Sequence, residues 1–80
     1  MRIESVRFLN DFIIELVLSN QKIVQYDFKP NLKTARFKHI HSQDFFQQGV
    51  LKEHCSIYWD PVTEIQDYEM LGIAYIKEDL

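Results

Sequence analysis

The side chains best suited to ligate a metal or attack a substrate are those of His39, His41, His54 and Cys55. Their spacing lacks the paired C-x-x-C or H-E-x-x-H pattern of zinc sites. A catalytic Cys55 would need a base oriented by a third group, and neighbours on a strand point to opposite faces, which turns His54 away. We therefore predict no catalytic residue, no metal ligand and no cofactor, and we expect that the chain is not an enzyme.

Charge is distributed unevenly along a chain whose formal net charge is −3. The basic segment, residues 29–41, contains no acid, and its phosphate-binding candidates are Lys29, Lys33, Arg36 and Lys38. Residues 60–80, by contrast, contain several acidic residues and a single basic one, Lys77. This asymmetry fits a phosphate-binding patch, two regions that attract each other across an interface, or ordinary solvated surface charge.

Residues 12–28 predict a β-hairpin around which the rest of the fold is arranged. Apolar side chains recur there at every second position, which places them on one face of a strand: Phe12, Ile14, Leu16 and Leu18. Residues 3–9 predict a strand before this hairpin, joined to it by a turn at Asn10-Asp11. Together these strands predict a three-stranded meander.

The register of the hairpin is open. A two-residue loop at Asn20-Gln21 would pair Leu18 with Ile23, whereas a loop of residues 20–22 would pair Leu18 with Val24. A slip of one residue exchanges the two faces of a strand, and neither loop contains the Gly that such turns favour.

The second half of the chain predicts short helices and another hairpin. Ser42 is suited to cap a helix through Gln48, with Gly49 as its left-handed stop. Residues 50–51 and 56–59 predict a hairpin that ends at Asp60-Pro61 and buries Trp59 on the sheet. Asp67 is suited to cap a helix over residues 68–77. The predicted fold is α+β: an antiparallel sheet of about five strands, a meander plus a hairpin, with one or two short helices packed on one face.

Length and composition predict one cytoplasmic domain over residues 1–80. The single Cys55 cannot form an internal disulfide, which fits a reducing cytosol. The chain has no apolar run of about 18 residues, and no signal-like apolar core follows Met1. We therefore expect no membrane role.

The order of several residues resembles that of a small bacterial family, domain of unknown function 2442. The matching positions are Ile3 and Val6, Asn20-Gln21, Asp27-Phe28, Pro30 and Leu32, Phe37 and Ile40, Phe45 and Phe46, Tyr58-Trp59, Glu64-Ile65, and Met70. The family-like region is residues 3–71, which leaves residues 72–80 as a C-terminal extension. Gln21, Asp60 and Val62 depart from the family pattern at turns.

The resemblance implies a fold and an accessory role, because some family genes lie beside a toxin gene and some members carry a DNA-binding helix-turn-helix. It supplies no catalytic residues. We expect a non-enzymatic protein-interaction module, an antitoxin-like or regulatory companion of a protein partner. The alternative is a nucleic-acid-associated accessory protein that uses the basic segment.

The expected contact surface lies near the C-terminus. If residues 68–77 form a helix, more than one of its faces is apolar, and a small domain has little core to cover them. The partner-binding candidates are Met70, Ile73, Tyr75 and Ile76. They would bind a second copy, as a homodimer, or a cognate protein. The alternatives are a tail that covers a sheet edge, or strand pairing by residues 73–76 after Gly72 breaks the helix.

Overall fold

Six strands form two antiparallel three-stranded sheets within residues 2–72, the part of the chain that the computed structural model describes. The N-terminal sheet contains β1 (Ile3–Leu9), β2 (Ile13–Leu18) and β3 (Ile23–Asp27). The C-terminal sheet contains β4 (Val50–Lys52), β5 (Ser56–Asp60) and β6 (Thr63–Gln66). The α+β class and the meander are confirmed. The single sheet of about five strands is wrong, because β6 adds a strand and the hairpin forms a sheet of its own.

The N-terminal sheet adopts a register that neither predicted loop provides. Leu16 pairs with Val24 and Ile14 with Tyr26, so the loop is residues 19–21. Gln21 reaches a left-handed φ of 70° and donates its backbone N–H to the Leu18 carbonyl at 2.8 Å. The turn therefore forms without Gly, and the register that it sets still matches apolar residues across the strands.

The turn between β1 and β2 removes Phe12 from the strand that was predicted to contain it. Asp11 and Phe12 have φ of 63° and 58° within a 3₁₀ turn, η1 (Asn10–Phe12). The Gln43 side chain bridges this turn: its Oε1 accepts from Phe12 N at 3.3 Å, and its Nε2 donates to the Leu9 carbonyl at 2.9 Å. A glutamine 31 residues further along the chain thus stabilises a backbone conformation that bulky residues rarely adopt.

Short helical turns connect the two sheets. They are η2 (Lys29–Lys33), η3 (Ala35–Phe37) and α1 (Gln43–Phe46). Ser42 caps α1 as predicted, since its Oγ accepts from Phe45 N at 3.1 Å. The helix ends at Phe46 rather than Gln48.

Gly49 is not the left-handed stop that was predicted, because it has no positive φ. Gly49 is needed at this position because it has no side chain. A Cβ at this position would lie 2.7 Å from Phe8 Cζ and 2.9 Å from Trp59 Nε1. Gly49 therefore lets the chain pass close to both rings.

The last described helix, α2 (Asp67–Leu71), follows β6 directly. Its N-cap is Gln66, one residue before the predicted Asp67, and Gln66 and Glu69 form a reciprocal capping box. The helix ends at Leu71, and Gly72 follows with φ of 87°. The predicted helix over residues 68–77 is therefore interrupted at Gly72, and its residues 73–77 lie outside the described part of the chain.

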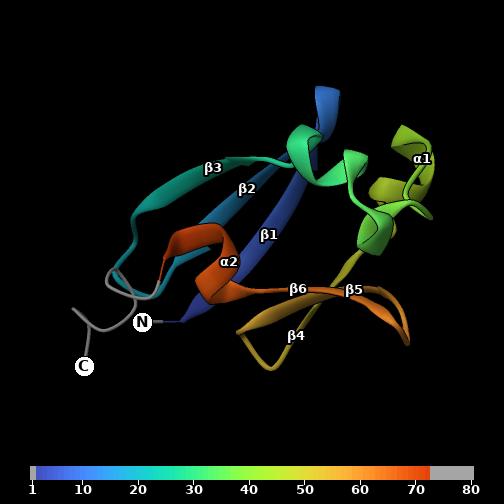
Figure 1. The fold of residues 1–80 in the computed structure, drawn as a ribbon. Coiled ribbons are helices and arrows are strands. Elements are labelled where there is room, and N and C mark those ends of the chain that lie inside the picture. The colour runs from blue at the N-terminus through green and yellow to red at the C-terminus, as the bar shows by residue number, and fades with distance from the viewer. Residues whose placement is uncertain (1, 73–80) are drawn as a thin grey trace.

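The core lies between the two sheets and is rich in aromatic rings. Figure 1 shows the C-terminal sheet beneath the N-terminal sheet, with the turns and α1 at one end and α2 near the other. The Phe28 ring lies 5.0 Å from Phe37, 5.2 Å from Trp59 and 5.5 Å from Phe46, measured between centroids. Trp59 is buried, and its indole N–H donates to the Phe46 carbonyl at 2.8 Å, so the prediction of a core Trp59 is confirmed.

No helix among residues 2–72 is long and apolar enough to cross a membrane.

Candidate interaction surface

The C-terminal sheet turns one face to the core and the other to the outside. Side chains alternate along a strand, so Ile57 and Trp59 of β5 enter the core while Tyr58 between them points away. The cross-strand neighbours of Tyr58 are Val50 on β4 and Glu64 on β6. Val50 is 62% exposed. The outer face of this sheet is therefore partly apolar.

An open concavity of about 570 Å³ lies on this outer face. It is lined by Gln48, Val50, Lys52, Tyr58, Trp59, Asp60 and Pro61. The ammonium of Lys52 sits 4.7 Å from the centre of the Tyr58 ring, a cation–π contact across the β4–β5 pair. The concavity thus combines apolar surface with an amide, a phenol and both signs of charge. Binding sites for other molecules commonly have this mixture.

The pKa values of two side chains in the concavity, Tyr58 and Asp60, are shifted away from neutral pH. Hydrogen bonding to Glu64 raises the pKa of the Tyr58 phenol. The backbone N–H of Val62, which donates to Asp60 Oδ1 at 3.0 Å, lowers the pKa of the Asp60 carboxyl, and the Thr63 side chain acts in the same direction. A general acid or base works best with a pKa near the working pH, so these shifts suit Tyr58 and Asp60 to fixed contacts rather than to proton transfer.

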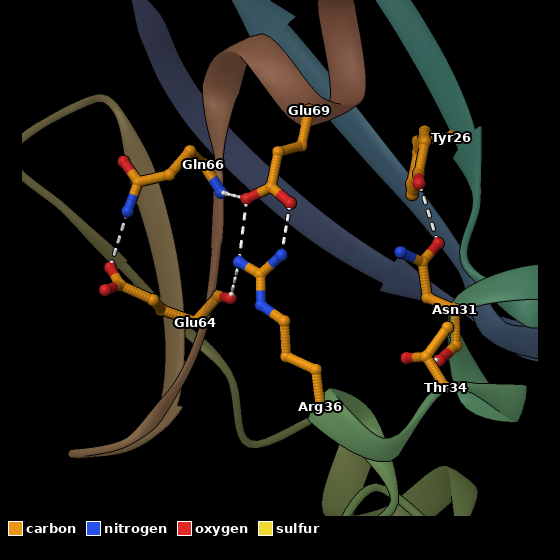
Figure 2. A network of polar contacts seen from close by, with 7 residues as sticks. All are labelled: Tyr26, Asn31, Thr34, Arg36, Glu64, Gln66 and Glu69. Carbon is orange, nitrogen blue, oxygen red and sulfur yellow. Dashed lines mark hydrogen bonds and ion pairs between the residues drawn. The ribbon is translucent and has the colours of Figure 1, made fainter.

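Arg36 of the basic segment is committed to a contact within the chain. Figure 2 shows its guanidinium between β6 and α2, where it forms two hydrogen bonds with the Glu69 carboxylate. Nη2 also donates to the Glu64 carbonyl at 2.7 Å. Glu69 Oε2 in turn accepts from Gln66 N at 2.8 Å. Oppositely charged regions of the sequence therefore meet here within one chain.

Of the other phosphate-binding candidates, Lys29 is paired with carboxylates, whereas Lys33 and Lys38 are exposed. Lys29 Nζ lies 3.0 Å from Asp27 Oδ1 and 3.1 Å from Asp11 Oδ2. The hydrogen bond with Asp27 raises the pKa of Lys29. Lys33 and Lys38 are exposed and form no ion pair within residues 2–72. A phosphate would thus compete with carboxylates for two of the four candidates.

His41, His54 and Cys55 make contacts with different partners, and His39 is exposed. His54 Nδ1 lies 3.0 Å from the Ile3 carbonyl, and the His41 ring stacks on Phe45 at 6.2 Å. Cys55 Sγ donates weakly to the Lys52 carbonyl at 3.9 Å. Residues 2–72 contain no cluster of three or more His, Cys, Asp or Glu that could hold a metal ion.

The predicted C-terminal contact residues do not form a described surface. Met70 is 8% exposed and packs in the core, so it is not available to a partner in this conformation. Ile73, Tyr75 and Ile76 lie outside the described residues.

Sequence reasoning did not identify the concavity or the Arg36–Glu69 contact. A signal existed for the concavity. Val50, Lys52 and Tyr58 alternate with core residues on the predicted hairpin, which places them together on its outer face. The spacing of Gln66 and Glu69 is that of a capping box, but it does not point to Arg36.

Comparisons with protein families, with curated proteins and with solved structures found no match. Membership of domain of unknown function 2442 therefore stays a prediction from the sequence.

Proposed function

We propose that this chain is a non-enzymatic protein-interaction module whose contact surface is the concavity on the outer face of the C-terminal sheet. The observation that carries the proposal is the exposure of Val50 at 62% beside Tyr58, in an open concavity of about 570 Å³. Tyr is among the residue types that contribute most to binding at protein interfaces, and Tyr58 lines this depression beside Val50. The family resemblance supports an antitoxin-like or regulatory companion role, and the lone Cys55 supports a cytoplasmic location.

The nucleic-acid alternative has weaker support. Of its candidate residues, Arg36 and Lys29 are paired with carboxylates, and the chain carries a net charge of −3. Proteins that bind nucleic acids through charge usually present a basic surface.

A matched pair of variants tests the proposal. Val50→Asp places a charge in the concavity, whereas Val62→Asp makes the same change at a residue that is 82% exposed in the β5–β6 turn and does not line it. A partner is first captured from extracts of the native cell with the unaltered protein and identified by mass spectrometry. It is then purified, and its dissociation constant is measured by calorimetry for each variant.

We expect Val50→Asp to weaken binding at least about tenfold, and Val62→Asp to leave it within about twofold of the original value, since peripheral contacts contribute little. A purified partner that binds both variants equally well would place the interface elsewhere. Failure of every captured protein to bind directly would reject the interaction role.

A further inference from the structure

The outer edge of β3 presents backbone groups that are available to another strand. Leu18 N donates to the Lys22 carbonyl at 2.9 Å, and Phe28 N donates to the Phe12 carbonyl at 2.9 Å, so even-numbered residues of β3 face β2. Hydrogen-bonded and non-hydrogen-bonded pairs alternate in an antiparallel ladder. The N–H and C=O groups of Ile23, Gln25 and Asp27 therefore point away from β2.

These outward backbone groups have no hydrogen-bond partner within residues 2–72. The corresponding groups of β6 differ. Asp67 N donates to the Cys55 carbonyl at 2.7 Å, which turns Glu64 and Gln66 outward. The Glu64 carbonyl then accepts from Arg36, and Gln66 N donates to Glu69. At the start of β1, Ile3 N donates to the His54 carbonyl at 3.0 Å, so one end of that edge is bonded.

The edge of β3 also lacks the features that usually prevent strand addition. Its five residues contain no Pro and no Lys, and its pairing with β2 shows no bulge. Ile23 is 63% exposed at one end. An edge of this kind is a template for another extended chain.

We propose that β3 pairs antiparallel with β3 of a second copy of this chain, with Gln25 of one chain opposite Gln25 of the other. Ile23 of each copy then exchanges backbone hydrogen bonds with Asp27 of the other copy, so each outward group gains a partner. The two N-terminal sheets join into one continuous sheet related by a two-fold axis, the commonest symmetry of homo-oligomers.

The cross-strand side-chain pairs that this register creates between the two β3 strands are favourable ones. On the face toward the core, Val24 of each copy lies opposite Tyr26 of the other, and pairs of a β-branched with an aromatic residue are favourable in sheets. Asp27 lies opposite Ile23 rather than another acid, and its carboxylate is already paired with Lys29 in its own chain. The register therefore places no like charges opposite each other.

The test removes a single outward backbone donor. Because Gln25 N–H points away from β2, Gln25→Pro blocks addition of a strand without removing a hydrogen bond from the β2–β3 ladder. Gln25→Thr, which keeps the N–H and suits a strand, is the control. Sedimentation of the full chain over micromolar to millimolar concentrations gives the dimer dissociation constant.

We expect a dimer for the unaltered protein and for Gln25→Thr, and a dissociation constant at least about tenfold higher for Gln25→Pro. An unaltered protein that sediments as a monomer throughout, or a Gln25→Pro variant that dimerises equally well, would overturn the proposal.

Amide hydrogen exchange of the unaltered protein provides a test without substitution. Protection of the Ile23, Gln25 and Asp27 amides should rise with protein concentration, because only the dimer bonds them. Protection that does not depend on concentration would also overturn the proposal.

Discussion

The strands β6 and β3 are both edges of three-stranded sheets, but their outward backbone groups differ in whether they have hydrogen-bond partners within residues 2–72. The edge of β6 is bonded by the Arg36 guanidinium and the Glu69 carboxylate, which reach it from the basic segment and from α2. The edge of β3 has no such cover within the described chain. The exposed Arg36–Glu69 ion pair thus satisfies backbone groups at the β6 edge. The β3 edge has no such pair and is suited to a partner strand.

The Arg36–Glu69 contact also accounts for part of the charge asymmetry along the sequence. Arg36 and Glu69 belong to the basic and acidic regions respectively, and their contact ties the segment between the sheets to the last described helix. A positive segment in sequence therefore need not be a phosphate site, because its charges can be used to hold the chain together.

The largest effect is expected from Trp59→Ala, which breaks the core on which both sheets depend. Trp59 of β5 contacts Phe28, next to the end of β3, and its N–H bonds to the Phe46 carbonyl. The substitution leaves a cavity and removes one of the two hydrogen bonds to the Phe46 carbonyl, which still accepts from Gly49 N at 3.4 Å. It should lower the free energy of unfolding by about 3–5 kcal/mol. Denaturant unfolding measures this loss. Tyr58→Ala, on the outer face of the same strand, is the control and should cost far less; equal losses would contradict the assignment of the faces.

A smaller effect is expected from Arg36→Met, which opens the β6 edge while keeping most of the side-chain volume. The Glu64 carbonyl and the Glu69 carboxylate then lose their charged donor. The Arg36 side chain is 46% exposed, so solvent screening limits the loss to about 1–2 kcal/mol. Amide exchange should quicken at Gln66, whose N–H bonds to Glu69, and should not change at Gln25. Equal quickening at both would show that the two edges are not independent.

The stabilisation that Glu69 provides at the β6 edge should depend on pH. Arg36, and then the Gln66 N–H, hold the pKa of Glu69 below its ordinary value of 4.5. A lowered pKa means that the folded state favours the carboxylate, so this stabilisation is present above pH 4.5 and is lost as the pH falls through the lower pKa of the folded state. The difference in unfolding free energy between the unaltered protein and Glu69→Gln should therefore shrink in acid. A difference that stays constant down to the acid limit would contradict the ion pair.

The sequence predicts the local elements of this fold better than their assembly. Strand alternation identified the meander and placed Ile14, Leu16 and Leu18 in the core, because the two-residue period depends only on neighbouring residues. It missed β6, since four residues after a proline turn carry little periodic signal, although Thr63 and Ile65 are both buried. The Gln43 bridge to Phe12 and the fit of Gly49 against Phe8 depend on contacts between distant segments, which no local pattern specifies.

The candidate surface was predicted less well than the fold. The C-terminal candidates were chosen for an excess of apolar residues, yet Met70 is used in the core. The burial of Trp59 was predicted, but the opposite face of the second hairpin, where Tyr58 lies, was not considered as a contact surface.

The smallest effect is expected from reversing the two remaining charges of the basic segment. Lys33 and Lys38 are exposed and belong to neither edge, so Lys33→Glu with Lys38→Glu should change the free energy of unfolding by no more than about 0.5 kcal/mol. Fluorescence anisotropy with labelled DNA and RNA at low salt then tests whether this segment binds phosphate groups or only makes contacts within the chain. We expect no binding by the unaltered protein, because Arg36 and Lys29 are already paired with carboxylates. A salt-sensitive affinity that this double variant abolishes, and that Lys52→Glu in the concavity preserves, would show instead that the segment also meets phosphates.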